Sequence, residues 1–232
     1  ASKLPLTSRA FRNDQLPLLA QQLCEMTGYE KVLPMNSGAE AVESALKLAR
    51  KWGYKVKGVA DNQAEIITCT GNFAGRTISI ISFSPEEQYR DGFGPLTPGF
   101  KMVEYGNADA LRDAITENTV AFIVEPIQGE GGVIVPPEGY LKAVREICTE
   151  NNVLMIADEI QTGFARTGNL LAMERYGISP DLTTMAKGLA GGLPLAAVCG
   201  RADIMDAAGP GGLGGTYGGN PLGIAAAHAV LN

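Results

Sequence analysis

The sequence predicts an α/β fold in which a mostly parallel sheet is covered by helices on both faces. Short apolar runs bounded by turn residues alternate with longer segments whose apolar residues recur at helical spacing. The apolar runs contain few polar residues, which is typical of strands that are buried on both faces. With 232 residues, of which 45% are hydrophobic and 19% charged, the chain can bury a substantial core.

The predicted elements follow one another in a regular order. The first helix is expected to end at Gly28, and the second has Val42, Leu46 and Ala49 at helical spacing. Helices are predicted over residues 16–27, 39–52, 107–116 and 140–150, and the chain is expected to end within a further helix. Strands are predicted over residues 31–35, 65–70, 120–124, 153–157, 182–185 and 195–199. Such alternation of strands and helices favours parallel pairing.

Composition excludes several classes of function. The net charge of −6 and the lack of a basic run argue against binding to nucleic acid or to an anionic membrane surface. No apolar stretch reaches the roughly 18 residues of a membrane span. His228 is the only histidine and the four cysteines are far apart, so no metal site is expected. Unpaired cysteines favour a reducing compartment, which here means the cytoplasm, with the mitochondrial matrix as the alternative.

Two ionisable residues follow apolar runs at the places where ligands bind in open α/β sheets. Asp158 ends the run VLMIAD, and Lys187 closes the run TTMA and opens the turn GLAGG. A carboxylate in such a place is costly to bury without a partner, whereas a lysine in a loop is more often simply exposed. An aspartate for a pyridine nitrogen and a lysine for an aldehyde are what pyridoxal phosphate requires of a protein. Between the apolar run and the turn, Lys187 is expected to be partly desolvated.

A phosphate site is expected at the start of the second helix. Ser37 and Glu40 form a capping box, which is the better explanation of this segment taken alone. Gly38 and Ala39 also leave bare backbone N–H groups at a helix N-terminus, where anions bind. The glycine-rich loop 211–219 around Thr216 is either a plain flexible loop or the source of a hydroxyl for the same phosphate. The segment is not a GxGxxG fingerprint, so a nicotinamide dinucleotide is disfavoured.

A flat cofactor ring also needs apolar faces and a partner for its hydroxyl. Phe73, in the loop GNFAGRT, is a candidate for one face, and Ile160 for the other. Each of these two residues, taken alone, is more often simply part of a core. Gln161 is a candidate for a contact with the ring hydroxyl.

Taken together, the motifs resemble those of the class III pyridoxal phosphate-dependent aminotransferases, of the ornithine and 4-aminobutyrate aminotransferase type. The resemblance covers essentially all 232 residues and rests on the ordered set NSGAEA, NFAGRT, EPIQGEGG, IADEIQTGFARTG, AKGLAGG and GGTYGGNP. It implies that residues 1–232 form the cofactor-binding large domain of fold type I. It also implies that an N-terminal segment and a C-terminal small domain of the family are absent from this chain.

The resemblance assigns roles to individual residues. Lys187 forms the Schiff base and moves the proton, Asp158 pairs with the pyridinium, and Gln161 holds the phenolic oxygen. The remaining cofactor contacts are Phe73 and Ile160 on the ring faces, and Ser37, Gly38, Ala39 and Thr216 at the phosphate. Thr216 comes from the partner subunit of a homodimer. The substrate-binding residues are Arg76, which binds a carboxylate, Glu130, which pairs with an arginine of the absent small domain, and Glu125, which lies near Asp158. Position 74 is Ala, where relatives usually carry His or Trp.

The implied reaction is transfer of the ω-amino group of ornithine or 4-aminobutyrate to 2-oxoglutarate. Two alternatives use the same scaffold, an acetylornithine transaminase and an aminomutase. A third is a cofactor-binding domain without catalytic activity.

Overall fold

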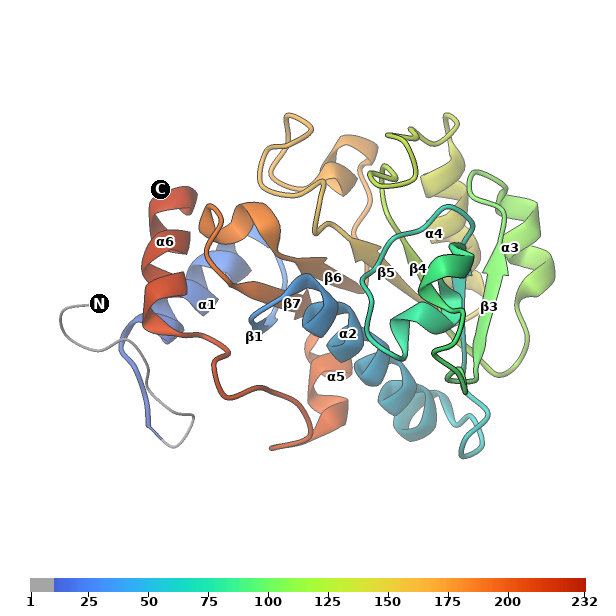
Figure 1. The fold of residues 1–232 in the computed structure, drawn as a ribbon, viewed down its shortest axis with the longest axis horizontal. Coiled ribbons are helices and arrows are strands. Elements are labelled where there is room, and N and C mark those ends of the chain that lie inside the picture. The colour runs from blue at the N-terminus through green and yellow to red at the C-terminus, as the bar shows by residue number, and fades with distance from the viewer. Residues whose placement is uncertain (1–10) are drawn as a thin grey trace.

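A computed structural model describes residues 11–232 of the chain. The helices are α1 (Gln15–Thr27), α2 (Gly38–Trp52), α3 (Ala108–Ala114), α4 (Tyr140–Glu150), α5 (Ala202–Met205) and α6 (Pro221–Leu231). The strands are β1 (Lys31–Met35), β2 (Glu65–Cys69), β3 (Phe100–Val103), β4 (Thr119–Val124), β5 (Leu154–Asp158), β6 (Leu182–Met185) and β7 (Ala196–Gly200). Figure 1 shows these strands as one central sheet with helices around it.

The seven strands form one sheet in the order β1-β7-β6-β5-β4-β2-β3. The pairs from β6 to β3 are all parallel, whereas β7 runs antiparallel to both β6 and β1. The prediction of a mostly parallel sheet is therefore confirmed. Because only β7 is reversed within the described sheet, the carboxyl ends of β1, β2, β4, β5 and β6 lie at the same edge.

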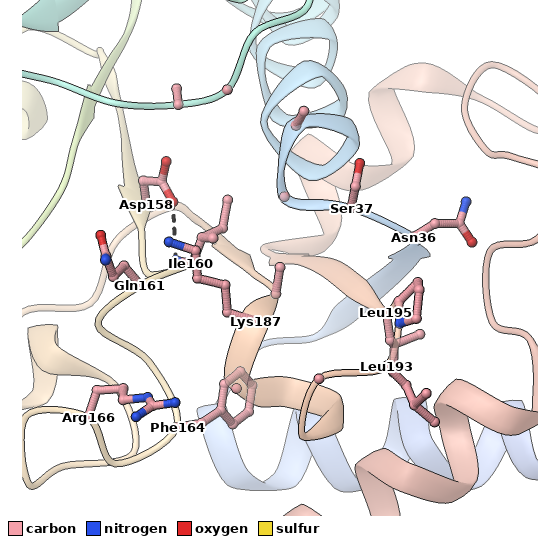
Figure 2. Close-up of a pocket in the computed structure, with 18 of the residues that line it drawn as sticks. Asn36, Ser37, Asp158, Ile160, Gln161, Phe164, Arg166, Lys187, Leu193 and Leu195 are labelled. Atoms are coloured by element: carbon pink, nitrogen blue, oxygen red, sulfur yellow. Dashed lines mark hydrogen bonds between the residues drawn. The ribbon is translucent and has the colours of Figure 1, made fainter. Parts of the chain in front are cut away.

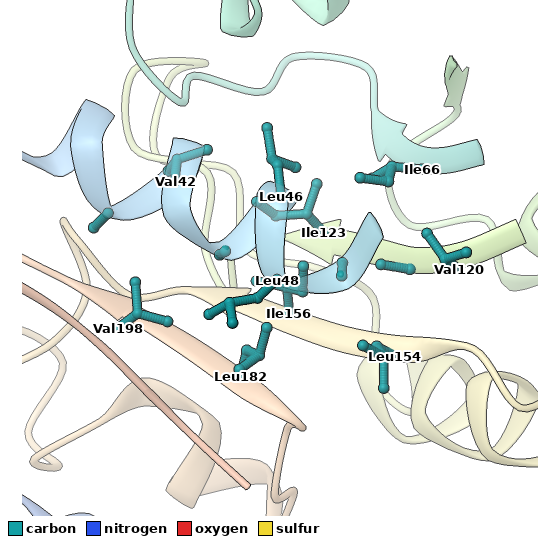
Figure 3. Close-up of a cluster of buried hydrophobic side chains, with 14 of the residues drawn as sticks. Val42, Leu46, Leu48, Ile66, Val120, Ile123, Leu154, Ile156, Leu182 and Val198 are labelled. Atoms are coloured by element: carbon teal, nitrogen blue, oxygen red, sulfur yellow. The ribbon is translucent and has the colours of Figure 1, made fainter. Parts of the chain in front are cut away.

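Helices cover both faces of the sheet, as predicted. Alternate strand residues face opposite clusters: Ile66 and Ile156 belong to one cluster, Ile67 and Met155 to the other. Helices α2 and α5 pack on the first face, and α1, α3, α4 and α6 pack on the second. Figure 3 shows α2 lying across the strands, and its residues Val42, Leu46 and Leu48 belong to the same cluster as Ile123, Ile156, Leu182 and Val198. The core therefore fixes the N-terminus of α2 relative to the ends of the strands.

The helix boundaries follow from local chemistry. The side chain of Asn13 accepts the N–H groups of Gln15 and Leu16, and α1 ends at Gly28 with φ of 75°. The side chain of Asn220 accepts the N–H of Gly223 at the start of α6. Each predicted helix and strand lies within two residues of an observed one, and β3, an edge strand that follows a Gly- and Pro-rich loop, was not predicted. None of the helices in residues 11–232 has the length and hydropathy needed to cross a membrane.

Candidate active site at the carboxyl edge of the sheet

A cavity of about 990 Å³ opens at the edge where the carboxyl ends of the strands meet. It is lined by segments that follow β1, β2, β4, β5 and β6, and Figure 2 shows many of their side chains converging on it. The predicted site residues that line it are Ser37, Gly38, Ala39, Phe73, Glu125, Asp158, Ile160, Gln161 and Lys187. Segments far apart in the sequence are thus brought together as the sequence predicts.

Asp158 and Lys187 come from neighbouring strands. Asp158 is the last residue of β5, and it pairs in register with Thr184 of the parallel strand β6. Lys187 follows β6 by two residues and begins a short 3-10 turn. Its φ of 40° lies in the left-handed region, which is strained for a residue with a side chain. Lys187 is exposed rather than partly desolvated as expected, because its side chain extends into the open cavity.

The carboxylate of Asp158 is buried, with a residue exposure of 5%, and has only neutral hydrogen-bond donors. Its Oδ1 accepts the N–H of Ile160 at 3.1 Å and the hydroxyl of Thr184 at 3.0 Å. Neither bond reaches Oδ2, and no ion pair to Asp158 exists among residues 11–232. Burial, together with the nearby charge of Glu125, raises the pKa of Asp158 to about 7. A cation in the cavity would reverse this shift.

The start of α2 contains the capping box and also leaves N–H groups available for an anion. The capping box is confirmed: Ser37 Oγ accepts the N–H of Glu40, whose carboxylate accepts the N–H groups of Asn36 and Ser37. No hydrogen bond within the described chain uses the N–H groups of Gly38 and Ala39. The helix therefore keeps two free donors facing the cavity, which is the arrangement that binds a phosphate.

The walls of the cavity depend on two glycines. A Cβ at Gly38 would lie 3.0 Å from Cδ1 of Ile160, so this glycine lets the Ile160 side chain pack closely against the start of α2. A Cβ at Gly129 would lie 1.7 Å from Oε1 of Gln161, so Gln161 occupies the space that a side chain there would fill. Phe73, which also lines the cavity, is half-buried, and its ring meets Tyr89 edge-on with 6.4 Å between the ring centroids.

Glu125 holds two of the loops that line the cavity. Its carboxylate accepts the N–H of Phe73 at 3.0 Å and the N–H of Gly129 at 3.2 Å. Burial raises the pKa of this carboxyl group, while the two N–H donors and the charge of Lys187 act in the opposite direction. Glu125 therefore positions Phe73, which lines the cavity, and Gly129, against which the side chain of Gln161 packs. A direct contact with substrate stays a prediction.

Three predicted residues do not line this cavity. Arg76 lies in a neighbouring cavity of about 370 Å³, where its guanidinium carbon is 4.4 Å from the ring centroid of Tyr89 and its Nη2 donates to the hydroxyl of Tyr89. Glu130 and Thr216 are both exposed and lie outside the cavity. The loop before Thr216 passes Asn36, because a Cβ at Gly215 would lie 3.6 Å from Asn36 Nδ2. The roles of these three residues stay predictions.

Other residues at the cavity were missed by the sequence analysis. Phe164, Arg166, Leu193 and Leu195 line it, and Thr184 holds Asp158 from the neighbouring strand. Arg166 could have been predicted from the sequence, because it belongs to the motif FARTG, which follows Asp158 closely. The contact of Thr184 was not, because it depends on the register between β5 and β6.

The geometry suits a ligand with three different groups. A helix N-terminus can bind its anion, a buried carboxylate can pair with a cationic ring nitrogen, and a primary amine can react with a carbonyl carbon. All three groups face one cavity.

The chain resembles proteins of known sequence and structure along its whole length. An ornithine aminotransferase of Brevibacillus brevis is 55% identical over 233 residues, which cover 100% of this chain and 58% of that protein. The crystal structure of an ornithine aminotransferase from Toxoplasma gondii superposes with a TM-score of 0.97 at 50% identity, covering 99% of this chain and 55% of that one. A second structure of the Toxoplasma protein is described as having partial occupancy of PLP at its active site. An acetylornithine aminotransferase from Elizabethkingia anophelis has a TM-score of 0.86 at 47% identity, covering 99% of this chain and 55% of that one.

These relatives are longer than this chain, which spans 58% of the length of the Brevibacillus protein. The family model for class III aminotransferases matches residues 1–232. With this match and the shared fold, the chain belongs to the class III aminotransferase family.

Proposed function

We propose that this chain carries the pyridoxal phosphate site of an ornithine aminotransferase, which moves the ω-amino group of ornithine to 2-oxoglutarate. The observation that carries the proposal is that Asp158 ends β5, that Lys187 follows the neighbouring parallel strand β6, and that both face one cavity with the start of α2. The names of the most similar relatives favour ornithine over 4-aminobutyrate as the donor.

The residues present fit this cofactor. The buried carboxylate of Asp158 has no cation partner among the described residues, and a protonated pyridine nitrogen supplies one. The free N–H groups of Gly38 and Ala39, with the hydroxyl of Ser37, suit the phosphate.

When bound, pyridoxal phosphate supplies an aldehyde that reacts with amines and a ring that draws electrons from the carbon bearing the amino group. The amine of Lys187 would hold the cofactor through its aldehyde, and when free its Nζ would accept and return the proton of the reacting substrate carbon. Asp158 would keep the ring nitrogen protonated, since its carboxylate has only neutral donors among the described residues. Phe73 and Ile160 would pack against the ring faces, and Gln161 would bind the ring oxygen.

The other proposals concern the whole protein. Residues 1–232 form its cofactor-binding large domain, and two copies form a homodimer in which the exposed Thr216 contacts the partner's phosphate site. Arg76 binds a substrate carboxylate from the neighbouring cavity, and Glu130 pairs with an arginine that is not part of this chain. A cytoplasmic location is proposed on the unpaired cysteines alone.

A donor screen with 2-oxoglutarate on the full-length protein tests the function. Ornithine is expected to give glutamate and to change the absorbance of the bound cofactor. Turnover of N-acetylornithine alone would favour the acetylornithine transaminase, supported by the structure from Elizabethkingia anophelis. Turnover of glutamate semialdehyde alone would favour an aminomutase, and a bound cofactor that no donor alters would favour a binding domain.

The attachment point is tested separately from turnover. Borohydride reduction followed by peptide mapping is expected to place the cofactor on Lys187, and Lys187→Ala is expected to abolish both the adduct and the activity. The control is Lys31→Ala, which removes an exposed lysine that pairs with Asp206 away from the cavity. An adduct on another lysine would overturn the assignment.

A further inference from the structure

The charged groups at the cavity differ in how they are compensated. Glu125, Asp158, Arg166 and Lys187 are the charged side chains among its described lining residues. Glu125 accepts two backbone N–H groups, and Asp158 accepts an N–H and a hydroxyl. Arg166 is exposed, and it has no hydrogen bond or ion pair with any of the described residues. Its guanidinium is therefore free to bind an anion that enters the cavity.

The backbone that carries Arg166 is held in a costly conformation. Phe164 and Ala165, the two residues before it, have φ of 58° and 63°, which is the left-handed region that favours glycine. Their N–H groups both donate to the carbonyl of Leu170, at 2.6 Å and 3.4 Å, and the N–H of Gly168 donates to the carbonyl of Ala165. Arg166 thus lies at the tip of a turn that its own hydrogen bonds close, rather than in a freely moving loop.

Hydrogen bonds of Glu159, the residue after β5, hold both ends of the segment that contains this turn and connect it to β6. The fully buried carboxylate of Glu159 accepts the hydroxyl of Thr162 and the N–H groups of Ala172 and Met173, at 3.0 Å and 2.8 Å. The N–H of Glu159 donates to the carbonyl of Thr184 in β6. Both ends of the segment are thereby tied to the residues around Asp158.

The turn also packs against the residue that follows Lys187. A Cβ at Gly188 would lie 3.2 Å from Cβ of Phe164, so the two segments are in close contact. Figure 2 shows Arg166 and Gln161 on one side of Lys187 and the apolar Leu193 and Leu195 on the other. The cavity thus has a cation carried by a hydrogen-bonded turn on one side of the Lys187 amine and an apolar wall on the other.

We propose that Arg166 binds a carboxylate of the substrate in this cavity and so contributes to substrate choice. The proposal rests on the proposed function and deepens it. A guanidinium binds a carboxylate through two parallel N–H donors, which orients the substrate as well as attracting it. Arg76, which is proposed above to bind a substrate carboxylate from the neighbouring cavity, donates to Tyr89 and does not share a cavity with Lys187. Among the described residues, Arg166 is the arginine that shares a cavity with Lys187.

The test measures carboxylate binding as well as activity, on the full-length protein loaded with pyridoxal phosphate. Glutarate, a dicarboxylate without a reactive carbonyl, is titrated by calorimetry, and KM and kcat are measured for 2-oxoglutarate. Arg166→Gln is expected to raise the Kd for glutarate and the KM for 2-oxoglutarate by about 10- to 100-fold, with a smaller change in kcat. Arg166→Lys keeps the charge without the paired donors and is expected to fall between wild type and Arg166→Gln.

The matched control is Arg175→Gln, which removes an exposed arginine outside the cavity. Unchanged glutarate affinity in both Arg166 variants would overturn the proposal, as would an equal loss of affinity in Arg175→Gln. The two proposals fail in different ways. A wild-type protein that turns over no donor contradicts the proposed function, while the glutarate titrations still decide the role of Arg166.

Discussion

Two buried aspartates lie at opposite ends of neighbouring strands and are treated differently by the fold. Asp158 ends β5 at the cavity, and Asp181 immediately precedes β6 at the other edge of the sheet, with exposures of 5% and 6%. Asp181 accepts Nη1 of Arg145 at 2.7 Å, Nη1 of Arg201 at 2.5 Å and the N–H of Met155 at 2.7 Å. Among the described residues, the carboxylate of Asp158 accepts hydrogen bonds only from the backbone N–H of Ile160 and the hydroxyl of Thr184.

The difference is between a buried charge that has cation partners within the chain and one that has none among the described residues. At Asp181 the two arginines compensate the charge within the chain, so burial is tolerated, and the aspartate links α4, β5 and the residue that follows β7. At Asp158 no described side chain supplies a cation, and burial raises the pKa to about 7. An uncompensated buried carboxylate beside an open cavity indicates that a ligand provides the missing positive charge.

The largest expected effect is on catalysis at the cavity. Asp158→Asn removes the charge that keeps the ring nitrogen protonated, so kcat for ornithine should fall by about 10³-fold. Cofactor retention should change much less, because the phosphate contacts at the start of α2 are intact. Steady-state kinetics and cofactor release on dilution measure the two effects. A kcat equal to that of the wild type would contradict the pairing.

The second prediction concerns stability against pH in the cofactor-free protein. Because the folded pKa of Asp158, about 7, lies above its ordinary value of 3.8, the carboxyl group binds its proton more tightly in the folded state. Its contribution to the free energy of unfolding is therefore lost as pH rises from about 4 to about 7. The shift from 3.8 to about 7 corresponds to about 4 kcal/mol.

Denaturant unfolding of wild type and Asp158→Asn at several pH values measures this loss. The two proteins should be about equally stable near pH 4, and the variant should be the more stable at pH 8. Saturation with pyridoxal phosphate should reduce the difference, since the ring nitrogen pairs with the carboxylate. A pH-independent difference would mean that Asp158 is already compensated.

At Asp181, at the other edge of the sheet, a substitution should change stability and leave catalysis unchanged. Asp181→Asn leaves Arg145 and Arg201 without their shared anion and should lower the free energy of unfolding by about 2–3 kcal/mol. This loss of stability should be smaller than for a fully buried ion pair, because both arginines are partly exposed to solvent. The KM and kcat of the folded variant should match wild type. A catalytic defect without a loss of stability in Asp181→Asn would contradict the purely structural role of Asp181.

The smallest effect concerns the backbone of Lys187. Its φ of 40° is strained for any residue with a Cβ, so Lys187→Gly should be more stable than Lys187→Ala by about 1 kcal/mol. Both variants lack the lysine amine and should be inactive, so their difference in stability reports only the backbone strain at this position. Thermal unfolding of the two cofactor-free variants measures the difference. Equal stabilities would show that the turn relaxes when the lysine is replaced.

The sequence could predict those features that depend on neighbours along the chain. Apolar runs and helical spacing predict the elements, the capping box at Ser37 predicts the start of α2, and the ends of the runs predict Asp158 and Lys187 as site residues. The strand β3 was missed because its short run follows a loop rich in glycine and proline and pairs only at the sheet edge.

Sequence alone therefore determined the alternation of elements and the residue types that meet at the carboxyl edge, because both are encoded in local periodicity and in the chemistry of single side chains. Only the tertiary structure decided that Thr184 holds Asp158, that Asp181 rather than Asp158 receives the arginines, and that Arg166 rather than Arg76 shares the cavity with Lys187. These contacts depend on strand register and on loops closed by distant residues, whose geometry follows from packing the whole chain.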